Sequence, residues 1–418
     1  MTHLRLTALL AGCVSVAAVG AASAGGFNRG SANLDGLYGT GDFGIYSGVT
    51  YVSPGREYET VGGLVIDGTW PGPPAPGIRP FEQSNLEFSD DYWVPYASVG
   101  GRLMGDLSCV GSYSQPYGAD SSYTGDITYH IAEQTLSSNE YGLTCGYGFD
   151  LSKGRLSVIG GVFYETIEYG QARNFEQAFG SMIVQGDSRI DIESQTWGYR
   201  LGVGYEIPEI ALKAQLMYRS QTDHEATGMY TNTPFAALAG LALGNPALGL
   251  ALYGANYSTT ATTNGSLPQN VELSVQSGIA PGWLAFGSIK WTDWSVLQQL
   301  QLVEGIQGTT FSTSRFFFND GWTVTGGAAH RFNDMVAASL SLTWDKGVTS
   351  GWDTLTDTWT IAGGVSIDPN PNVNFRFGGA AIYFTDGFKS NTSSAIDYTA
   401  YSPAEWGFAL SASGSVKF

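Results

Sequence analysis

The chain has little charge for its length, since Asp, Glu, Lys and Arg together make up 13% of its 418 residues. Soluble domains average about 25% charged residues, so much of the usual polar coat is missing. The formal net charge is −18. This argues against nucleic acid or an anionic membrane surface as a partner, because basic surfaces bind both. Low charge suits a membrane β-barrel, which places its lipid-facing residues singly along strands. A large soluble β-sandwich is the alternative.

Long uninterrupted apolar runs are missing beyond the N-terminus, which argues against transmembrane helices. Residues 1–24 have the features of an export signal: Arg5, an apolar stretch over 6–19 and the small residues Ala-Ser-Ala at 22–24. Cleavage there leaves Gly25 as the first mature residue. The alternative is lipoprotein processing at Leu-Ala-Gly-Cys, residues 10–13.

Residue types that carry catalysis or bind metals are scarce. The four histidines, His3, His130, His224 and His330, are too scattered for a metal cluster. The sequence contains no P-loop, no HExxH motif and no nucleophile elbow. We therefore expect no catalytic residues, no metal and no cofactor. A hydrolase with a serine–histidine pair at a loop rim is the enzyme alternative, but no residue is placed to orient such a histidine.

From about residue 43 the chain alternates apolar and polar residues, as in 210–219, 271–279 and 336–345. Each such segment predicts a strand with one apolar and one polar face. Short connections are expected at 103–106, 150–154, 208–209, 280–282, 333–334 and 368–371. Long connections are expected at 54–90, 117–135, 170–190, 222–266, 296–315, 347–353 and 386–404. Short periplasmic turns alternate with longer extracellular loops in outer-membrane barrels. The pattern predicts an all-β transmembrane antiparallel barrel of about fourteen strands over 43–418, with both ends in the periplasm.

The last strand ends on an aromatic residue, Phe418, which continues the apolar face of its segment. Such an ending is typical of chains handed to the outer-membrane assembly machinery. Two cysteines, Cys109 and Cys145, fall on the same face of adjacent predicted strands. Directly opposed residues on antiparallel strands lie within disulfide range, so the sequence allows either a cross-strand disulfide or two free thiols.

The longest predicted loop, 222–266, contains an uncharged apolar stretch that Gly-Asn-Pro interrupts at 244–246. We expect two short helices that meet at this break rather than one transmembrane helix. An exposed apolar patch usually marks an interaction site, and capping of the barrel is the plainer alternative. The residues expected to form a docking groove for substrate are Phe235, Leu238, Leu241, Leu248, Leu250 and Leu252.

Two stretches resemble a known family: "SLPQNVELSVQSGIAPGWLAFGSIKWTDWSVLQQL" at 266–300 and "YSQPYGADSSY" at 113–123. They are similar to the outer-membrane long-chain fatty acid transport proteins (the FadL/OmpP1/TodX family). That family's members have an N-terminal plug of about forty residues with an Asn-Pro-Ala element. Here residues 25–42 are the whole expected hatch and lack that element, so the chain resembles an atypical, short-hatch branch.

The resemblance implies a passive, substrate-selective channel in the outer membrane of a Gram-negative bacterium. Long-chain fatty acids or similar hydrophobic compounds would dock in the apolar loop groove, enter the barrel and leave sideways at a kinked strand. The glycine pairs at 100–101 and 160–161 are candidates for such a kink. The alternatives are a general porin for polar solutes and uptake of aromatic hydrocarbons. The expected surroundings are membrane lipid and lipopolysaccharide, and a monomer is expected.

Basic side chains that face inward are candidates to pair with a substrate carboxylate. Alternatively, these cations belong to an internal charge network with Glu206, Glu272 and Asp345. The candidates are Arg200, Lys213, Arg219, Lys290 and Arg376.

Overall fold

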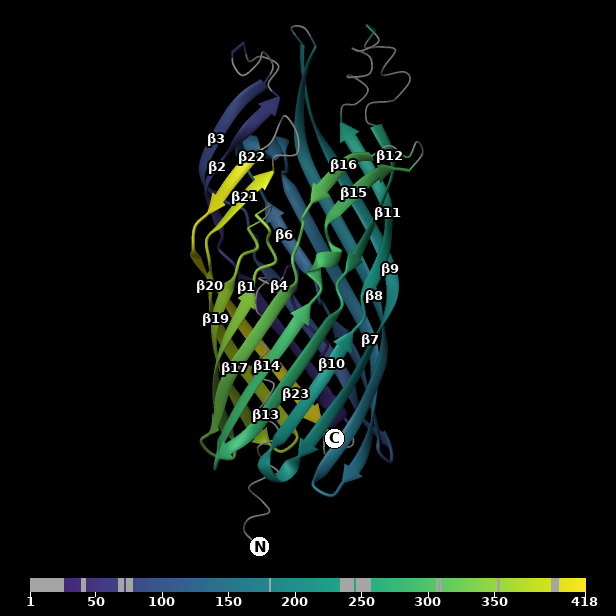
Figure 1. The fold of residues 1–418 in the computed structure, drawn as a ribbon, viewed down its shortest axis with the longest axis vertical. Helices are drawn as coiled ribbons and strands as arrows, with labels where there is room; N and C mark the ends of the chain where they lie inside the picture. Colours follow the sequence, from purple (N-terminus) through teal and green to yellow (C-terminus); the bar gives the residue numbers. More distant parts are fainter. Residues whose placement is uncertain are drawn as a thin grey trace.

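The chain forms a closed antiparallel β-barrel of fourteen strands in a computed structural model (Figure 1). The first strand closes the barrel because it pairs with both the second and the last. The barrel strands, in order around the wall, are β1 (Gly44–Ser53), β4 (Tyr92–Met104), β5 (Leu107–Ser114), β7 (Glu133–Leu151), β8 (Gly154–Phe179), β9 (Met182–Ile207), β10 (Leu212–Arg219), β13 (Asn270–Ala280), β14 (Trp283–Thr292), β17 (Gly321–Arg331), β18 (Val336–Lys346), β19 (Thr358–Asn370), β20 (Val373–Phe384) and β23 (Glu405–Lys417).

The structure describes residues 26–38, 43–66, 71–72, 78–179, 182–233, 244–245, 257–305, 308, 310–351, 354–391 and 398–418. Among these residues, no helix is both long and apolar enough to cross a membrane.

The alternation of the sequence appears as two faces of the barrel wall. On β18, for example, Leu340 is 63% exposed on the outside, whereas its neighbour Ser341 is buried on the inside. The outer wall carries large apolar side chains on other strands too, such as Ile361 on β19 and Leu410 on β23. Lipid surrounds the outer face, so apolar side chains are favourable there, and the polar side chains point into the barrel.

The predicted short connections lie together at one end of the barrel, where β23 also ends (Figure 1). Two of them turn at Gly105 and Gly282, whose φ angles of 55° and 77° are strained for other residues. Gly44 at the start of β1 faces Lys417 at the end of β23. Both ends of the barrel chain are therefore at the short-turn side, as an even strand count requires.

Six of the seven predicted long loops contain strands, and two of these matter for the barrel wall. The segment 170–190 continues β8 and β9, which have 26 residues each, although about 9–11 residues suffice to cross a bilayer. The segment 222–266 contains β11 (Thr222–Thr233) and β12 (Tyr257–Leu267). The interpretation as loops was wrong because strands beyond the membrane need no apolar outer face, so their polar composition resembles that of a loop.

These strands form a wall above the membrane on one side of the barrel (Figure 1). β9 pairs with β11, β11 with β12, and β12 with β15 (Gln299–Glu304), which pairs with β16 (Thr310–Arg315). One buried side chain of this wall is Tyr169, and burial raises its pKa to about 12.

A second sheet of four strands lies above the other side of the barrel (Figure 1). It encloses an apolar core with the short 3-10 helix η3 (Gly125–Tyr129). Its strands, in order, are β21 (Gly387–Asn391), β22 (Tyr398–Ser402), β2 (Glu57–Ile66) and β3 (Ile78–Glu87).

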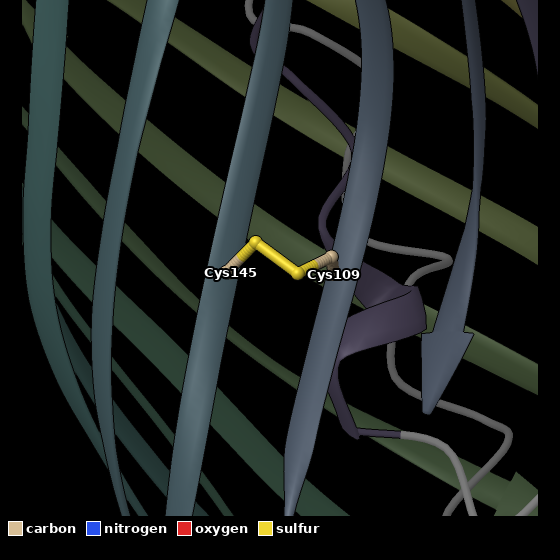
Figure 2. The surroundings of a disulfide bond; sticks show 2 residues. All are labelled: Cys109 and Cys145. Carbon is tan, nitrogen blue, oxygen red and sulfur yellow. A yellow bond between two sulfur atoms is a disulfide. The ribbon is translucent and has the colours of Figure 1, made fainter. Parts of the chain in front are cut away.

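Residues 26–38 lie inside the barrel. Their last turn is the 3-10 helix η2 (Asp35–Tyr38), whose Leu37 packs against the inward side chains Val110 and Ile159. Figure 2 shows this turn, in purple, behind β5 and on its β4 side. A Cβ atom at Gly36 would lie 2.9 Å from a methyl carbon of Val110, so the turn fits tightly against the inner wall.

Cys109 and Cys145 form a disulfide that joins β5 to β7 (Figure 2). The two residues are directly opposite each other, with their Cα atoms 4.0 Å apart. Of the two alternatives that the sequence left open, the structure has the bridge. It ties the third barrel strand covalently to the fourth.

Candidate functional site

The third barrel strand is interrupted halfway up the wall. β5 ends at Ser114, and the chain resumes as β6 (Gly118–Ser122) after a Gln-Pro-Tyr segment. β5 pairs with both β4 and β7, but β6 pairs with β7 alone. Residues 93–95 of β4 therefore have no ladder partner on this side among the described residues. We call this opening in the ladder the strand break.

The glycine pairs proposed to permit a kink do not lie at the strand break. Gly100 and Gly101 pair with β5, and Gly160 and Gly161 pair with β7 on one side and β9 on the other. The interruption is instead at Pro116, which has no backbone N–H to donate to a ladder.

The N-terminal segment fills the inner side of the strand break. Arg29 N–H donates to the carbonyl of Pro116 at 2.8 Å, and Gly118 N–H donates to the carbonyl of Phe27 at 2.8 Å. The Arg29 guanidinium lies over the Tyr92 ring of β4 at 3.9 Å and pairs with Asp120 of β6 at 2.8 Å. Arg29 thus bridges the two strands that do not pair with each other.

The segment also joins an apolar cluster at the top of the lumen. The Phe27 ring is 5.6 Å from the Trp294 ring and 5.6 Å from the Phe318 ring, measured between centroids. Trp294 begins the 3-10 helix η5 (Trp294–Val296) in the connection after β14 and is fully buried. Residues 26–38 are therefore held at both the wall and the outer connections.

A cavity of about 210 Å³ lies between this segment and the inner wall. Its lining is mostly polar and includes residues of the segment, such as Asp35, and of β9, β10, β13 and β14. Four of the predicted cations line it: Arg200, Lys213, Arg219 and Lys290.

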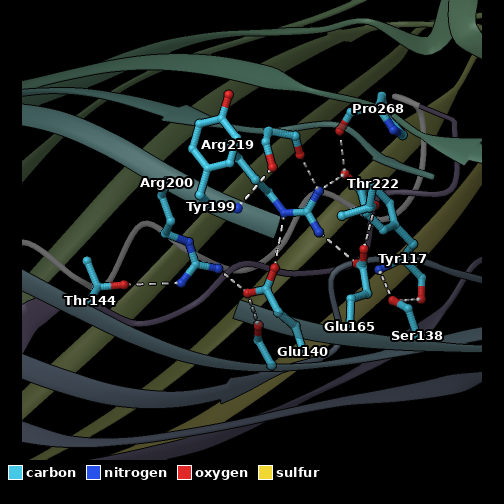
Figure 3. Close-up of polar contacts among 12 residues, drawn as sticks. Tyr117, Ser138, Glu140, Thr144, Glu165, Tyr199, Arg200, Arg219, Thr222 and Pro268 are labelled. Atoms are coloured by element: carbon cyan, nitrogen blue, oxygen red, sulfur yellow. Dashed lines mark hydrogen bonds and ion pairs between the residues drawn. The ribbon is translucent and has the colours of Figure 1, made fainter. Parts of the chain in front are cut away.

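Two of these cations belong to a buried charge network (Figure 3). Arg219 donates to Glu140 at 3.0 Å and to Glu165 at 2.7 Å. Arg200 also pairs with Glu140, and Thr222 donates to Glu165 at 2.7 Å. Glu165 is fully buried and Glu140 nearly so. Each guanidinium is therefore matched by a carboxylate within the wall.

The network reaches the strand break through Tyr117. Arg219 donates to the Tyr117 hydroxyl at 3.2 Å, and that hydroxyl donates to the carbonyl of Pro268 at 3.1 Å (Figure 3). The backbone N–H of Tyr117 donates to Ser138 Oγ at 2.8 Å. The residue at the interruption is therefore fixed from the lumen as well as from β7.

The other three predicted cations also have acidic neighbours. Lys213 is directly opposite Glu206 and its ammonium lies 3.7 Å from the centre of the Tyr38 ring. Lys290 is directly opposite Glu272. Arg376 lies 3.9 Å from Asp35 of the N-terminal segment. The described lumen thus has no large excess of positive charge.

Several residues of the strand break and of the charge network were not predicted from the sequence. Glu140 and Glu165 share the parity of inward residues, but nothing in the sequence marks them as partners of Arg219, which lies three and two strands away from them. Arg29 lies in the predicted hatch with no periodic pattern around it. The Pro at 116 within "YSQPYGADSSY" was the one available signal for the strand break. The predicted docking residues, Phe235, Leu238, Leu241, Leu248, Leu250 and Leu252, lie outside the described residues.

Comparisons with known proteins agree with this architecture. The long-chain fatty acid transport protein of Escherichia coli O6:H1 is 28% identical over 259 residues, which cover 58% of this chain and 57% of that protein. The chain thus aligns with just over half the length of this curated relative.

Solved structures share the fold at low sequence identity. A Pseudomonas aeruginosa FadL homologue has 13% identity and a TM-score of 0.73, with 90% of each chain covered. The Pseudomonas putida toluene transporter TodX has 11% identity and a TM-score of 0.58, with 92% of this chain and 91% of that chain covered.

The model of one protein family, described as outer membrane protein transport protein (OMPP1/FadL/TodX), matches residues 124–383. This match covers more than half of the chain. The chain is therefore an outer-membrane β-barrel that belongs to the OMPP1/FadL/TodX family of outer membrane transport proteins.

Proposed function

We propose that this chain is a passive, substrate-selective channel for the uptake of long-chain fatty acids or similar hydrophobic compounds. Members of the family are transport channels rather than enzymes. The observation that carries the proposal is the strand break, which the N-terminal segment covers from inside and which has apolar side chains beside it. A channel for polar solutes needs an open axial lumen and has no use for a side opening.

The apolar side chains beside the strand break form a cluster across five strands, which we call the break cluster. It includes Tyr92 and Val94 near the start of β4, on the side of the strand break. Its buried members are Val52, Tyr92, Val94, Ala362, Ile382, Phe384 and Ala409. A hydrocarbon chain gains about 0.8 kcal/mol per buried methylene. The cluster therefore offers a ligand an apolar route from the lumen toward lipid, once the N-terminal segment moves.

Capture from outside is proposed for the apolar stretch 234–254. The polar lipopolysaccharide layer hinders direct entry of a hydrophobic molecule into the bilayer, so a collecting surface is useful. The chain has Leu241 and Leu250 on either side of its Gly-Asn-Pro break. β11 and β12, which flank this stretch in the sequence, extend beyond the membrane (Figure 1).

The charge balance of the lumen supports a second candidate substrate class, uncharged aromatic hydrocarbons. Lys213 and Lys290 line the cavity and would serve a carboxylate head group. Both lie opposite a carboxylate of the protein, Glu206 and Glu272 respectively. A carboxylate head group would have to compete with these glutamates for the lysines, whereas a hydrocarbon without a head group would not. One solved relative is a toluene transporter by name.

Uptake by cells tests the proposal. A strain without its own long-chain fatty acid channel would express the wild type or the variant Leu241→Ser/Leu250→Ser, and uptake of labelled oleate and toluene would be measured. We expect uptake with the wild type and a severalfold slower rate with the variant, because docking loses apolar area. Met229→Ser, at an exposed position of β11, is the control and should transport normally.

The outcomes separate the proposals. Uptake of toluene without oleate favours the uncharged class. Equal uptake by the leucine variant and the wild type contradicts docking at 234–254. Uptake of neither compound above the empty strain contradicts the proposed function.

A further inference from the structure

Asp345 is a buried carboxylate on the inner wall of the barrel. It is 4% exposed and lies on β18 beside Trp344, which faces outward at the extracellular end. Thr323 on β17 is directly opposite and donates to Asp345 Oδ2 at 2.8 Å. Thr358 on β19 is directly opposite on the other side. The carboxylate therefore lies in a row of threonines that spans three strands.

Two polar groups of this row, and Thr360 two residues further along β19, have atoms without a hydrogen-bond partner. Asp345 Oδ1 has no hydrogen-bond partner, and neither do the hydroxyls of Thr358 and Thr360. Thr358 is 1% exposed and Thr360 3% exposed. A buried polar atom without a partner costs free energy, and a threonine hydroxyl can turn to accept or donate. These three groups are a ready site for a ligand atom.

Asp345 has no ion-pair partner among the described residues, and the charge of Lys290 acts on it only from a distance. No basic group lies within 4.0 Å of Asp345 among the described residues. Lys290 is the basic residue of the same row, but it is two strands away, or about 10 Å at the usual strand spacing. Lys290 has Glu272 directly opposite, which is closer. Asp345 thus differs from Glu140 and Glu165, which arginines satisfy.

The row ends at the break cluster. Thr358 is directly opposite Phe384, and Thr360 is directly opposite Ile382. Both apolar residues are buried members of the cluster that extends to Val94 at the strand break. Polar and apolar parts of the inner wall therefore meet here, in an arrangement that matches a molecule with one polar head and a hydrocarbon body.

We propose that Asp345, with Thr358 and Thr360, forms a subsite for hydrophobic molecules whose head group donates a hydrogen bond, namely a hydroxyl or a protonated amine. The head would donate to Asp345 Oδ1, and the hydrocarbon would lie on the break cluster. A carboxylate head is disfavoured, because it only accepts hydrogen bonds when ionised and would face the Asp345 carboxylate. This inference rests on the proposed uptake function and narrows its substrate class.

Binding of three ligands with the same twelve-carbon chain tests the subsite. Purified protein in lipid nanodiscs would be titrated with dodecan-1-ol, dodecylamine and dodecanoate at pH 9, so that Asp345 is ionised, with dissociation constants measured from tryptophan fluorescence. We expect the alcohol and the amine to bind about tenfold or more tightly than dodecanoate, as expected for one hydrogen bond to a charged group.

Two variants and a control assign the effect to this site. Asp345→Asn keeps the shape but loses the charge, and we expect it to weaken alcohol and amine binding about tenfold and to remove the discrimination against dodecanoate. Thr358→Val removes one hydroxyl and should weaken both less. Ser339→Ala, on the same strand and inner face but six residues away, is the control and should bind like the wild type. The heat-dependent gel mobility of a folded barrel verifies that each variant is folded.

The results separate the subsite from the channel. If the three ligands bind equally and Asp345→Asn changes nothing, the proposed subsite is wrong and water alone hydrogen-bonds to these groups. The proposed function would still stand. If none of the three ligands binds the folded wild type, the proposed function fails with it. A preference for the amine over the alcohol, lost in Asp345→Asn, identifies the donor as cationic.

Discussion

A disulfide engineered between Asn28 and Tyr117 is expected to reduce uptake at least tenfold when oxidised, and reduction should restore it. These residues form an isolated antiparallel bridge between the N-terminal segment and the strand break, and directly opposed antiparallel residues lie within disulfide range. If ligand leaves through the strand break, the segment that covers it must move. A covalent link holds it in place.

Comparison within one variant removes the effect of the substitutions themselves. The double variant Asn28→Cys/Tyr117→Cys would be assayed for uptake of a labelled hydrophobic compound before and after dithiothreitol treatment. Each single variant and the wild type, which keeps its native disulfide Cys109–Cys145, would be treated identically. Unchanged uptake in the fully cross-linked protein would show that ligand does not pass behind residues 26–38.

Arg219→Met is expected to lower the free energy of unfolding by about 3–5 kcal/mol, the usual effect of removing one partner from a buried ion pair. Glu165 is fully buried, and Arg219 is its closest cation at 2.7 Å. Methionine keeps much of the volume but leaves this carboxylate without its partner. Arg200 continues to neutralise Glu140, so the cost arises mainly at Glu165.

Urea unfolding in lipid vesicles measures this change. Adding Glu165→Gln to Arg219→Met should restore a large part of the lost stability, because the amide needs no counter-charge. The matched control is Arg155→Met, which breaks the half-exposed ion pair with Asp106 at a periplasmic turn and should cost at most about 1 kcal/mol. Equal losses for Arg219→Met and Arg155→Met would contradict the role of burial.

The membrane part of the fold was predictable from the sequence, and the extracellular part was not. Within the bilayer, every second side chain of a strand faces lipid and is apolar. The alternation in segments such as 336–345 therefore identifies the outer and inner faces of the strand. Beyond the bilayer this constraint ends. The strands over 170–190 therefore looked like a loop.

The candidate site could be predicted from the sequence only in part. Parity placed Arg200, Lys213, Arg219 and Lys290 on the inner wall, and three strands bring them to one cavity. Parity cannot say which carboxylate pairs with which arginine, because that depends on the register between strands that are not consecutive in the sequence. The position of Arg29 against Tyr92 and Asp120 likewise follows from the path of residues 26–38 through the barrel, which has no periodic signal.

Single-channel conductance in planar bilayers tests most directly whether the barrel is a plugged, side-opening channel rather than an open pore. With residues 26–38 packed against Val110, Pro116 and Trp294, the account predicts little steady conductance for the wild type and a marked rise when these residues are deleted. A large, steady conductance of the intact protein would contradict it and would identify a general porin.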